Sequence, residues 1–200
     1  VPLGFQIGNS LEIEEAVQTL HGEGPEDLTE VCLALASELL RLAGKGDLDF
    51  CRQLAREAMD SGAALEKLCA MFEAQGGDPA YVREPQKLGR APYEIEVKAS
   101  ESGYIAQMNA EDVGLAASLL GAGRETKESI IDPLAGIILC RKTGDAVRQG
   151  ETIARLLTSE EMKLESAQKK LQEAIVIQQD PPARRPLIYA RVTEQGVEYR

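Results

Sequence analysis

Residues 2–16, with the sequence PLGFQIGNSLEIEEA, lead from an extended stretch with two glycines straight into an acidic helix. Asn9 or Ser10 can cap that helix, Glu12 stands at the capping-box position three residues after Asn9, and Gly22 can end it. A loop of this kind presents backbone carbonyls and can place a carboxylate beside them, two turns into the helix. It is typical of the middle of a domain, and it forms a binding site only with groups supplied from elsewhere.

The composition is that of an ordinary globular protein with one large or two small domains. The chain has 200 residues, of which 44% are apolar and 28% are charged. No apolar run approaches the roughly 20 residues that span a bilayer, and the start has neither the cationic flank nor the apolar core of a signal peptide. We therefore expect a cytoplasmic protein that does not contact membranes. Because the first residue is Val1 rather than Met, we also expect a chain cut from a longer protein.

The formal net charge of -11 is unevenly distributed along the chain. Residues 1–80 contain 5 Lys or Arg against 15 Asp or Glu, whereas residues 81–200 contain 17 against 18. The acidic first half argues against nucleic-acid binding, because contacts from lysine and arginine to phosphates supply most of that affinity.

The cysteines and the single histidine argue against two common kinds of site. Cys32, Cys51, Cys69 and Cys140 include no C-x-x-C pair, and the first three lie in helical patterns, which favours buried thiols over disulfides or metal ligands. With His21 as the only histidine, a zinc site or a Ser-His-Asp triad is nearly excluded. Its place just before a Gly-Glu-Gly turn is typical of a helix end.

Three further helices are predicted before residue 80. The second helix of the chain begins near Pro25 and is apolar on more than one side, so we expect it to pack between two layers of its domain. The third begins at Asp47 or Asp49 and reaches about Met59, and the fourth covers roughly residues 63–74. Asp47 and Asp49 resemble a metal-binding pair, but helix capping explains short carboxylates at this position better.

Prolines and a glycine between residues 78 and 92 mark the expected domain boundary, and beyond them the pattern changes to alternation. Tyr93, Ile95 and Val97 alternate with charged residues, which predicts a half-exposed strand. Further patterns predict strands over 104–108, 136–142 and 152–157, helices over 110–120 and 159–177, and a hairpin over 187–192 and 197–199. The fold class is therefore α+β, with domains at 1–80 and 93–200 joined by a linker at 81–92.

Two glycine-containing segments resemble ligand sites, but other features of the sequence argue against both. The Gly121-Ala122-Gly123 loop follows a helix, whereas phosphate-binding loops precede one, so a C-terminal cap is favoured. The strand and turn pattern over 142–157 resembles the barrel-sandwich module of lipoyl and biotinyl carriers. A carrier needs an exposed lysine at a hairpin tip, and the available tip over 108–111 has none.

Short motifs distributed over essentially the whole chain resemble the C-terminal half of bacterial pyrimidine-nucleoside phosphorylases and of the similar thymidine phosphorylases. Each motif is weak alone, and the resemblance rests on their order and spacing. They are Pro2-Leu3-Gly4 with residues 8–12, then residues 22–28, 74–78 and 120–124, then Gly144-Asp145 with Val147 and Gly150, and finally residues 186–189.

In that family, phosphate attacks the anomeric carbon of a pyrimidine nucleoside and releases the free base and a pentose 1-phosphate. The resemblance implies that residues 1–80 are the C-terminal helical portion of a catalytic α/β domain and that 93–200 form an α/β-hammerhead domain. It also implies a homodimer in the full-length enzyme. The family's phosphate loop and base-holding side chains precede the matched region. We therefore expect no catalytic or organic-cofactor-binding residue in this chain, and no activity from it alone.

One site implied by the resemblance reaches into this sequence, a potassium site beside the family's phosphate loop. Two backbone carbonyls of that site map onto Leu3 and Gln6, and its carboxylate maps onto Glu15. A hard cation prefers oxygen ligands and any residue can supply a carbonyl, so Gln6 in place of the family's common Ala changes little. Compensation of the helix dipole is the alternative role of Glu15. Because the other ligands are missing, we expect the ion to be held poorly.

Two functions from different classes remain open at this stage. The first is a part of a homodimeric pentosyltransferase whose partners are phosphate and a pyrimidine nucleoside, with no nucleic acid and no membrane. The second is a non-catalytic interaction or regulatory module derived from the phosphorylase tail. The pattern as a whole favours the broad pyrimidine enzyme over the thymidine-restricted one.

Overall fold

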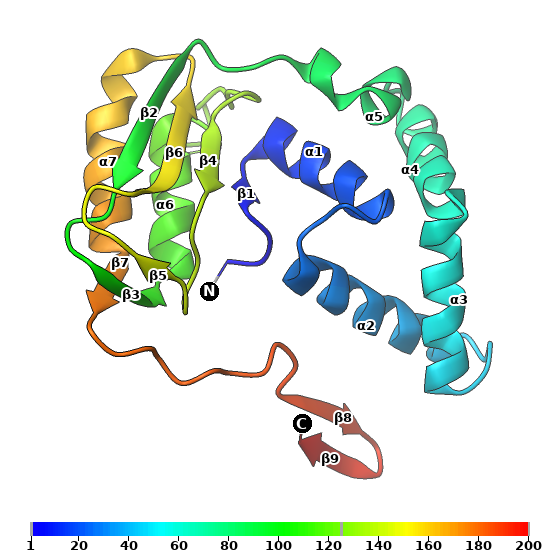
Figure 1. Cartoon of the computed structure of the whole chain (residues 1–200). Helices are drawn as coiled ribbons and strands as arrows, with labels where there is room; N and C mark the ends of the chain where they lie inside the picture. The colour runs from blue at the N-terminus through cyan, green and yellow to red at the C-terminus, as the bar shows by residue number, and fades with distance from the viewer. Residues whose placement is uncertain (1, 125, 200) are drawn as a thin grey trace.

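The computed structural model describes residues 2–124 and 126–199, in which a helical part and a part rich in strands lie side by side (Figure 1). The helical part contains β1 (Gln6–Ile7), α1 (Asn9–Leu20), α2 (Glu26–Leu42), α3 (Leu48–Asp60), α4 (Ala63–Ala74), α5 (Ala80–Arg83) and the 3₁₀ helix η1 (Pro85–Leu88). The other part contains β2 (Tyr93–Lys98), β3 (Gly103–Met108), α6 (Ala110–Leu120), β4 (Gly136–Leu139), β5 (Ala146–Val147), β6 (Thr152–Thr158), the 3₁₀ helix η2 (Glu161–Lys163), α7 (Leu164–Glu173), β7 (Ile175–Gln178), β8 (Ala190–Thr193) and β9 (Gly196–Tyr199).

The predicted helices before residue 80 are confirmed to within a few residues, although the first is capped differently. The residue before α1 is Gly8, so neither Asn9 nor Ser10 provides the predicted side-chain cap. The side chain of Glu12 does reach back, and its Oε1 accepts a hydrogen bond of 3.1 Å from the Gly8 N–H. His21 is the C-cap of α1, as its position before the glycine turn predicts.

The start of α3 confirms helix capping at the Asp47 and Asp49 pair. Asp47 is the N-cap residue, and its Oδ1 accepts a hydrogen bond of 2.9 Å from the Phe50 N–H. Asp49 lies in the first turn, where a negative charge suits the helix dipole. The start of the helix therefore explains both carboxylates.

Asp47→Ala is expected to lower the free energy of unfolding by about 1 kcal/mol, because the Phe50 N–H loses its acceptor. Asp49→Ala is the matched control, since it removes a nearby charge without removing the cap, and it should cost a few tenths of a kcal/mol. Urea denaturation followed by circular dichroism measures both. Equal losses in the two variants would show that the cap contributes nothing of its own.

Helix α2 is not buried on both sides in the described residues, so the prediction of a central helix is wrong there. One side packs against α3 and buries Leu33 and Ser37. On the other side Leu35, Leu39 and Leu42 leave 61%, 68% and 73% of their area exposed. The sequence pattern does specify two apolar sides, but no second layer covers the leucine side within the described residues.

The cysteines confirm the predicted thiols and correct one predicted burial. All four are free, and Cys51 and Cys69 are buried. Cys140 is half-buried, whereas Cys32 is exposed. Cys32 precedes Leu35 by one helical turn on α2, so it lies on the same uncovered side of that helix.

The strands form antiparallel sheets, which confirms the α+β class. One sheet has four strands in the order β1-β4-β6-β2, a second has three in the order β5-β3-β7, and β8 and β9 form a hairpin. Helices α6 and α7 pack on each other and against the larger sheet (Figure 1). The main apolar core lies between these layers and includes Ile105, Leu120, Ile137, Leu156 and Leu171. No closed barrel forms among the described residues.

The predicted helix over 159–177 is too long at both ends. It is reduced to α7 with the 3₁₀ helix η2 before it, and Ile175–Gln178 form β7 instead. Strand β7 pairs with β3, with Ile177 opposite Ile105, and Ile175 and Ile177 are half-buried while Val176 is half exposed. This alternation with period two is typical of a strand. As a strand, β7 pairs with the backbone groups along the edge of β3, which a continued helix could not do. The predicted strand over 136–142 similarly ends at Leu139.

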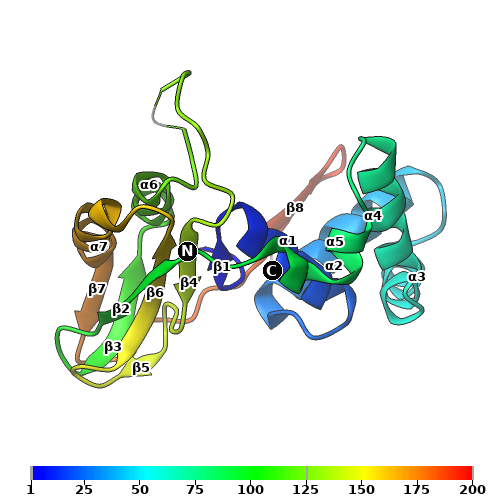
Figure 2. The same cartoon turned by 90° about the horizontal axis from the view of Figure 1, so that it is seen from above.

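Strand β1 joins the beginning of the chain to the strand-rich part. Gln6 stands opposite Ile138 and Ile7 opposite Ile137, and the Leu139 N–H donates to the Phe5 carbonyl at 2.7 Å. Seen from above, β1 and α1 lie where the helical part meets the strand-rich part (Figure 2). The segment that opens the sequence therefore connects the helices to the sheet.

Candidate functional site

Glu15 lies on the buried side of α1, in line with Leu11 and Thr19 at a spacing of four residues. These three residues are 4%, 2% and 5% exposed, respectively. The Thr19 hydroxyl donates a hydrogen bond of 2.8 Å to the Glu15 carbonyl, which keeps the polar Thr side chain satisfied inside. The helical register therefore carries a carboxylate into the interior, where it needs partners.

The N-terminal turn, residues 3–6, folds around the Glu15 carboxylate and supplies those partners. Glu15 Oε1 accepts hydrogen bonds from the Phe5 N–H at 2.7 Å and from the Gln6 N–H at 3.2 Å. Gly4 has a φ of +66°, and a Cβ at this position would lie 2.1 Å from Glu15 Oε2. Only glycine therefore fits between the turn and the carboxylate.

The pKa of Glu15 is raised above its ordinary value, and burial is the main cause because it disfavours the charged form. The hydrogen bonds from Phe5 and Gln6 oppose this shift, as does the positive charge of Lys142, while the negative charge of Asp27 adds to it. Burial thus disfavours the charged carboxylate more than the two N–H groups and Lys142 favour it.

Lys142 brings a charge to this site from the loop after β4. Its Nζ forms an ion pair with Asp27 Oδ2 in the first turn of α2, and it lies 5.1 Å from the centre of the Phe5 ring. The two charged side chains are only 13% and 22% exposed. The Lys142 backbone is fixed in turn, because its N–H donates to Asp145 Oδ2 at 2.7 Å.

The oxygens near Glu15 match the ligand chemistry of a hard monovalent cation. The Phe5 carbonyl accepts from the Leu139 N–H at the end of β4, while the Gln6 N–H reaches Glu15. Gln6 Oε1 is buried and, among the described residues, has no hydrogen-bond partner. Leu3 is 44% exposed at the start of the turn. The oxygens present therefore suit a hard cation in kind, and Leu3, Gln6 and Glu15 by themselves would not fill the coordination shell of potassium.

The comparisons with known proteins cover almost the whole chain. Residues 104–178, which run from β3 to β7, match the family model of the pyrimidine nucleoside phosphorylase C-terminal domain. The chain is 44% identical over 193 residues to pyrimidine-nucleoside phosphorylase of Geobacillus stearothermophilus, covering 96% of this chain and 44% of that protein. The chain belongs to the pyrimidine-nucleoside phosphorylase family.

Other members of the pyrimidine-nucleoside phosphorylase family give the same result. The enzyme of Staphylococcus haemolyticus is 46% identical over 178 residues, which cover 88% of this chain and 41% of that protein. The enzyme of Staphylococcus aureus strain USA300 is 44% identical over 194 residues, covering 96% and 44%. The resemblance inferred from the motifs is thus confirmed, and the chain spans less than half the length of the curated relatives it matches.

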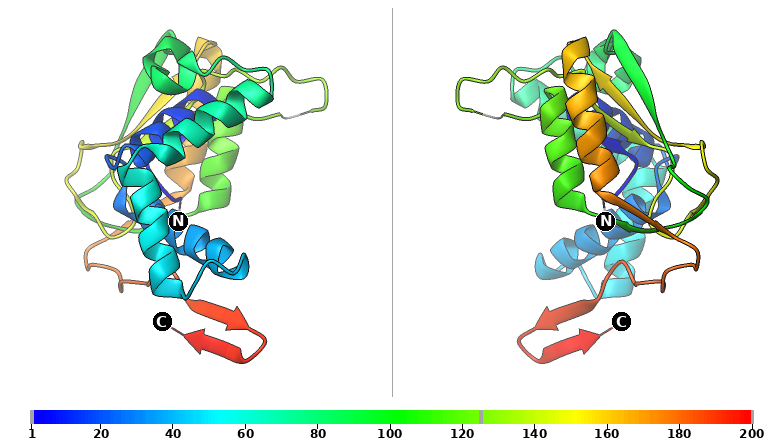
Figure 3. Two further views of the ribbon diagram at one scale, coloured as in Figure 1. Left: turned by 90° about the vertical axis from the view of Figure 1, so that its right-hand side faces the viewer. Right: turned by 90° about the vertical axis from the view of Figure 1, so that its left-hand side faces the viewer.

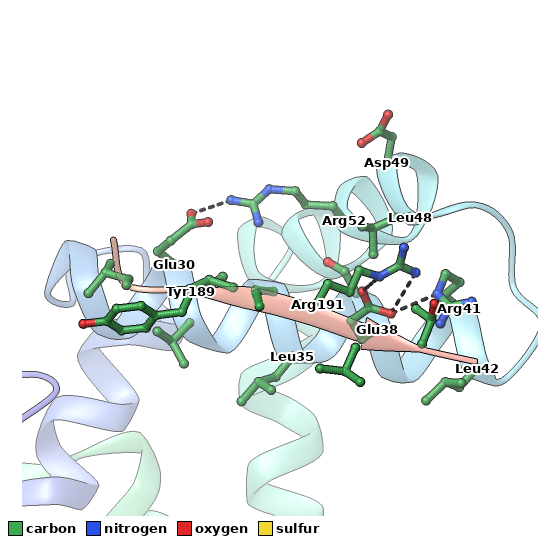
Figure 4. Close-up of a pocket in the computed structure, with 18 of the residues that line it drawn as sticks. Glu30, Leu35, Glu38, Arg41, Leu42, Leu48, Asp49, Arg52, Tyr189 and Arg191 are labelled. Carbon is green, nitrogen blue, oxygen red and sulfur yellow. Dashed lines mark hydrogen bonds and ion pairs between the residues drawn. The ribbon is translucent and has the colours of Figure 1, made fainter. Parts of the chain in front are cut away.

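A surface groove of about 1320 Å³ lies between α2, the start of α3 and the β8–β9 hairpin, on the side of α2 that carries Leu35 and Leu42 (Figure 4). Arg191 of β8 holds the hairpin there, with its Nε 2.5 Å from Glu38 Oε1, and Arg41 approaches Glu38 Oε2 at 2.9 Å. Figure 3 shows the hairpin projecting from the rest of the chain beside these helices. The walls of the groove carry paired charges and exposed leucines, and the groove lies apart from the Glu15 site.

Of the three positions that the resemblance assigns to a cation, the structure joins Gln6 to Glu15 by a hydrogen bond, and Leu3 lies at the start of the same turn. Sequence reasoning did not find Lys142 and Asp27, because they are 115 residues apart and each looks like an ordinary turn or helix-start residue. The remaining candidates are structural. Gly121 is the C-cap of α6 with a φ of 108°, and the described residues contain no group of three or more His, Cys, Asp or Glu placed to hold a metal.

Proposed function

We propose that this chain is the C-terminal part of a pyrimidine-nucleoside phosphorylase, which uses phosphate to split a pyrimidine nucleoside into the free base and a pentose 1-phosphate. The observation that carries the proposal is the 44% identity, over 96% of the chain, to an enzyme of that name. In the complete protein we expect phosphate and nucleoside as substrates and a homodimer as the assembly.

The N-terminal turn and Glu15 are the part of the active region that this chain contributes in our proposal. Glu15 and the carbonyls of Leu3 and Gln6 would hold a potassium ion, and the bound ion would supply positive charge beside the phosphate. The Phe5 and Gln6 N–H groups orient the Glu15 carboxylate, and Gly4 allows the close approach. Charge stabilisation of this kind is usually the largest single contribution to such a reaction.

We further propose that the groups that bind the nucleoside and phosphate lie in the part of the enzyme that precedes these residues. Lys142 is the cationic side chain that acts on Glu15, and it is already paired with Asp27. This pairing supports the placement of the phosphate-binding groups in another part of the enzyme. The described helices include none long and apolar enough to cross a membrane. The four free thiols support a reducing compartment, and we propose the cytoplasm.

The 200-residue chain is expected to release no uracil from uridine and no thymine from thymidine in the presence of phosphate. The complete natural protein that contains it should release both bases, and chromatography of the free base measures each reaction. Turnover by the chain alone would refute the claim that the reacting groups lie elsewhere. An inert complete protein would refute the phosphorylase function and favour a non-catalytic module.

A further inference from the structure

Three charged side chains are linked through the N-terminal turn, because Phe5 contacts both Glu15 and Lys142, and Lys142 pairs with Asp27. Glu15 comes from α1, Asp27 from the first turn of α2, and Lys142 from the loop after β4. All three are largely withdrawn from solvent, with Glu15 4% exposed and the side chains of Asp27 and Lys142 22% and 13% exposed. Charges in such a setting are poorly screened, so their sum matters to any ion that enters.

The sum of these charges is -1, because two carboxylates face one ammonium group. The ammonium group is fixed in place from two directions, by its ion pair with Asp27 and by its position 5.1 Å from the centre of the Phe5 ring. Phe5 is the residue whose N–H holds the Glu15 carboxylate at 2.7 Å. Lys142 therefore acts on Glu15 through its charge, and it contacts the residue that holds the Glu15 carboxylate in place.

We propose that Lys142 is a specificity-determining residue of the cation site, which leaves one net negative charge by cancelling Asp27 and so selects a monovalent over a divalent cation. This inference rests on the potassium site of the proposed function. A site of net charge -1 is neutralised by one monovalent ion, whereas a divalent ion would leave a buried excess of positive charge. Calcium is the informative competitor, because it also takes several carbonyl and carboxylate oxygens in flexible geometry.

The test measures the melting temperature of the complete natural protein during titration with potassium chloride or calcium chloride, at an ionic strength held constant with choline chloride. The wild type should be stabilised by potassium at lower concentrations than by calcium. Lys142→Met leaves a net charge of -2, and the ratio of calcium to potassium affinity should rise by about tenfold or more. Lys142→Arg keeps the charge and should keep the preference for potassium.

Two further variants separate this effect from a general loss of stability. Asp27→Asn leaves no net charge and should weaken potassium binding by about tenfold without favouring calcium. Lys170→Met is the matched control, because Lys170 forms a similar pair with Asp112 at 2.5 Å between α7 and α6, and it should leave the ratio unchanged. If Lys142→Met does not fold, Lys142→Gln makes the same test.

The inference is overturned if the wild type shows no stabilisation by potassium, or if the ratio of affinities in Lys142→Met equals that in Lys170→Met. The release of free base, measured separately, distinguishes this failure from failure of the proposed function. If the complete protein cleaves nucleosides but Lys142→Met leaves the ratio of calcium to potassium affinity unchanged, the inference alone is contradicted. A protein that changes its ratio but cleaves no nucleoside contradicts the proposed reaction alone.

Discussion

Glu15→Ala is expected to lower the free energy of unfolding by about 2–3 kcal/mol, because the N–H groups of Phe5 and Gln6 lose a charged acceptor in a partly buried turn. The same change should abolish stabilisation by potassium in the complete protein, since the turn then has no carboxylate to offer. Glu15→Gln keeps an oxygen acceptor and should cost less stability, while still losing the charge that attracts the ion.

Glu14→Ala is the matched control, since Glu14 is the adjacent carboxylate and pairs at 3.0 Å with the largely exposed Arg90. A surface ion pair of this kind contributes less than about 1 kcal/mol. Urea denaturation gives the free energies, and melting curves in potassium and choline chloride give the response to the ion. Equal losses of stability at positions 14 and 15 would contradict the role assigned to the Glu15 carboxylate.

Gly136→Ala is expected to cost about 3 kcal/mol, at the upper end for an overpacked position. A Cβ on Gly136 would lie 2.2 Å from the Ile7 carbonyl oxygen and 2.8 Å from Leu11 Cδ1, so β1 must move away from β4. The Leu139 N–H, which donates to Phe5 in the same pairing, should then exchange its hydrogen with solvent much faster. Urea denaturation and amide hydrogen exchange measure the two effects.

Gly114→Ala provides a control of opposite sign for the same chemical change. Gly114 lies in the middle of α6, and no heavy atom other than its chain neighbours and the nearby backbone of its own helix lies within 4 Å of the position of an added Cβ. Alanine should therefore stabilise the helix by up to about 1 kcal/mol. If Gly136→Ala also stabilises the protein, the close approach of β1 to β4 does not hold the N-terminal turn in place.

The helices of the first 80 residues follow from local rules, which is why the sequence predicts them well. Asp47 caps α3 and Gly62 allows the turn before α4, and both act over three or four residues. The end of α7 depends instead on a distant partner. Residues 175–178 carry an apolar pattern short enough to suit either structure, and pairing with β3 decides for the strand.

Helix α2 also shows that a sequence pattern does not specify which distant segment packs against it. Its leucines predict burial on two sides, and the described residues cover only the side that faces α3. Periodicity reports that an apolar side needs a partner, but it does not report which segment provides one. The arrangement of the strands into two sheets likewise depends on pairing between distant residues rather than on any one strand.

The sequence by itself determined the family, through the order of its motifs, and the helices of the first 80 residues, because helical period and capping are local properties. The cation-ligand candidates Leu3, Gln6 and Glu15 are implied by the family resemblance alone. The tertiary structure alone decided how the Glu15 carboxylate is held and which charges surround it. Asp27 and Lys142 are 115 residues apart, and the pairing of β1 with β4 places the N-terminal turn beside the strand that Lys142 follows. Electrostatic interaction depends on distance in space, and the spacing of residues along a chain does not reveal that distance.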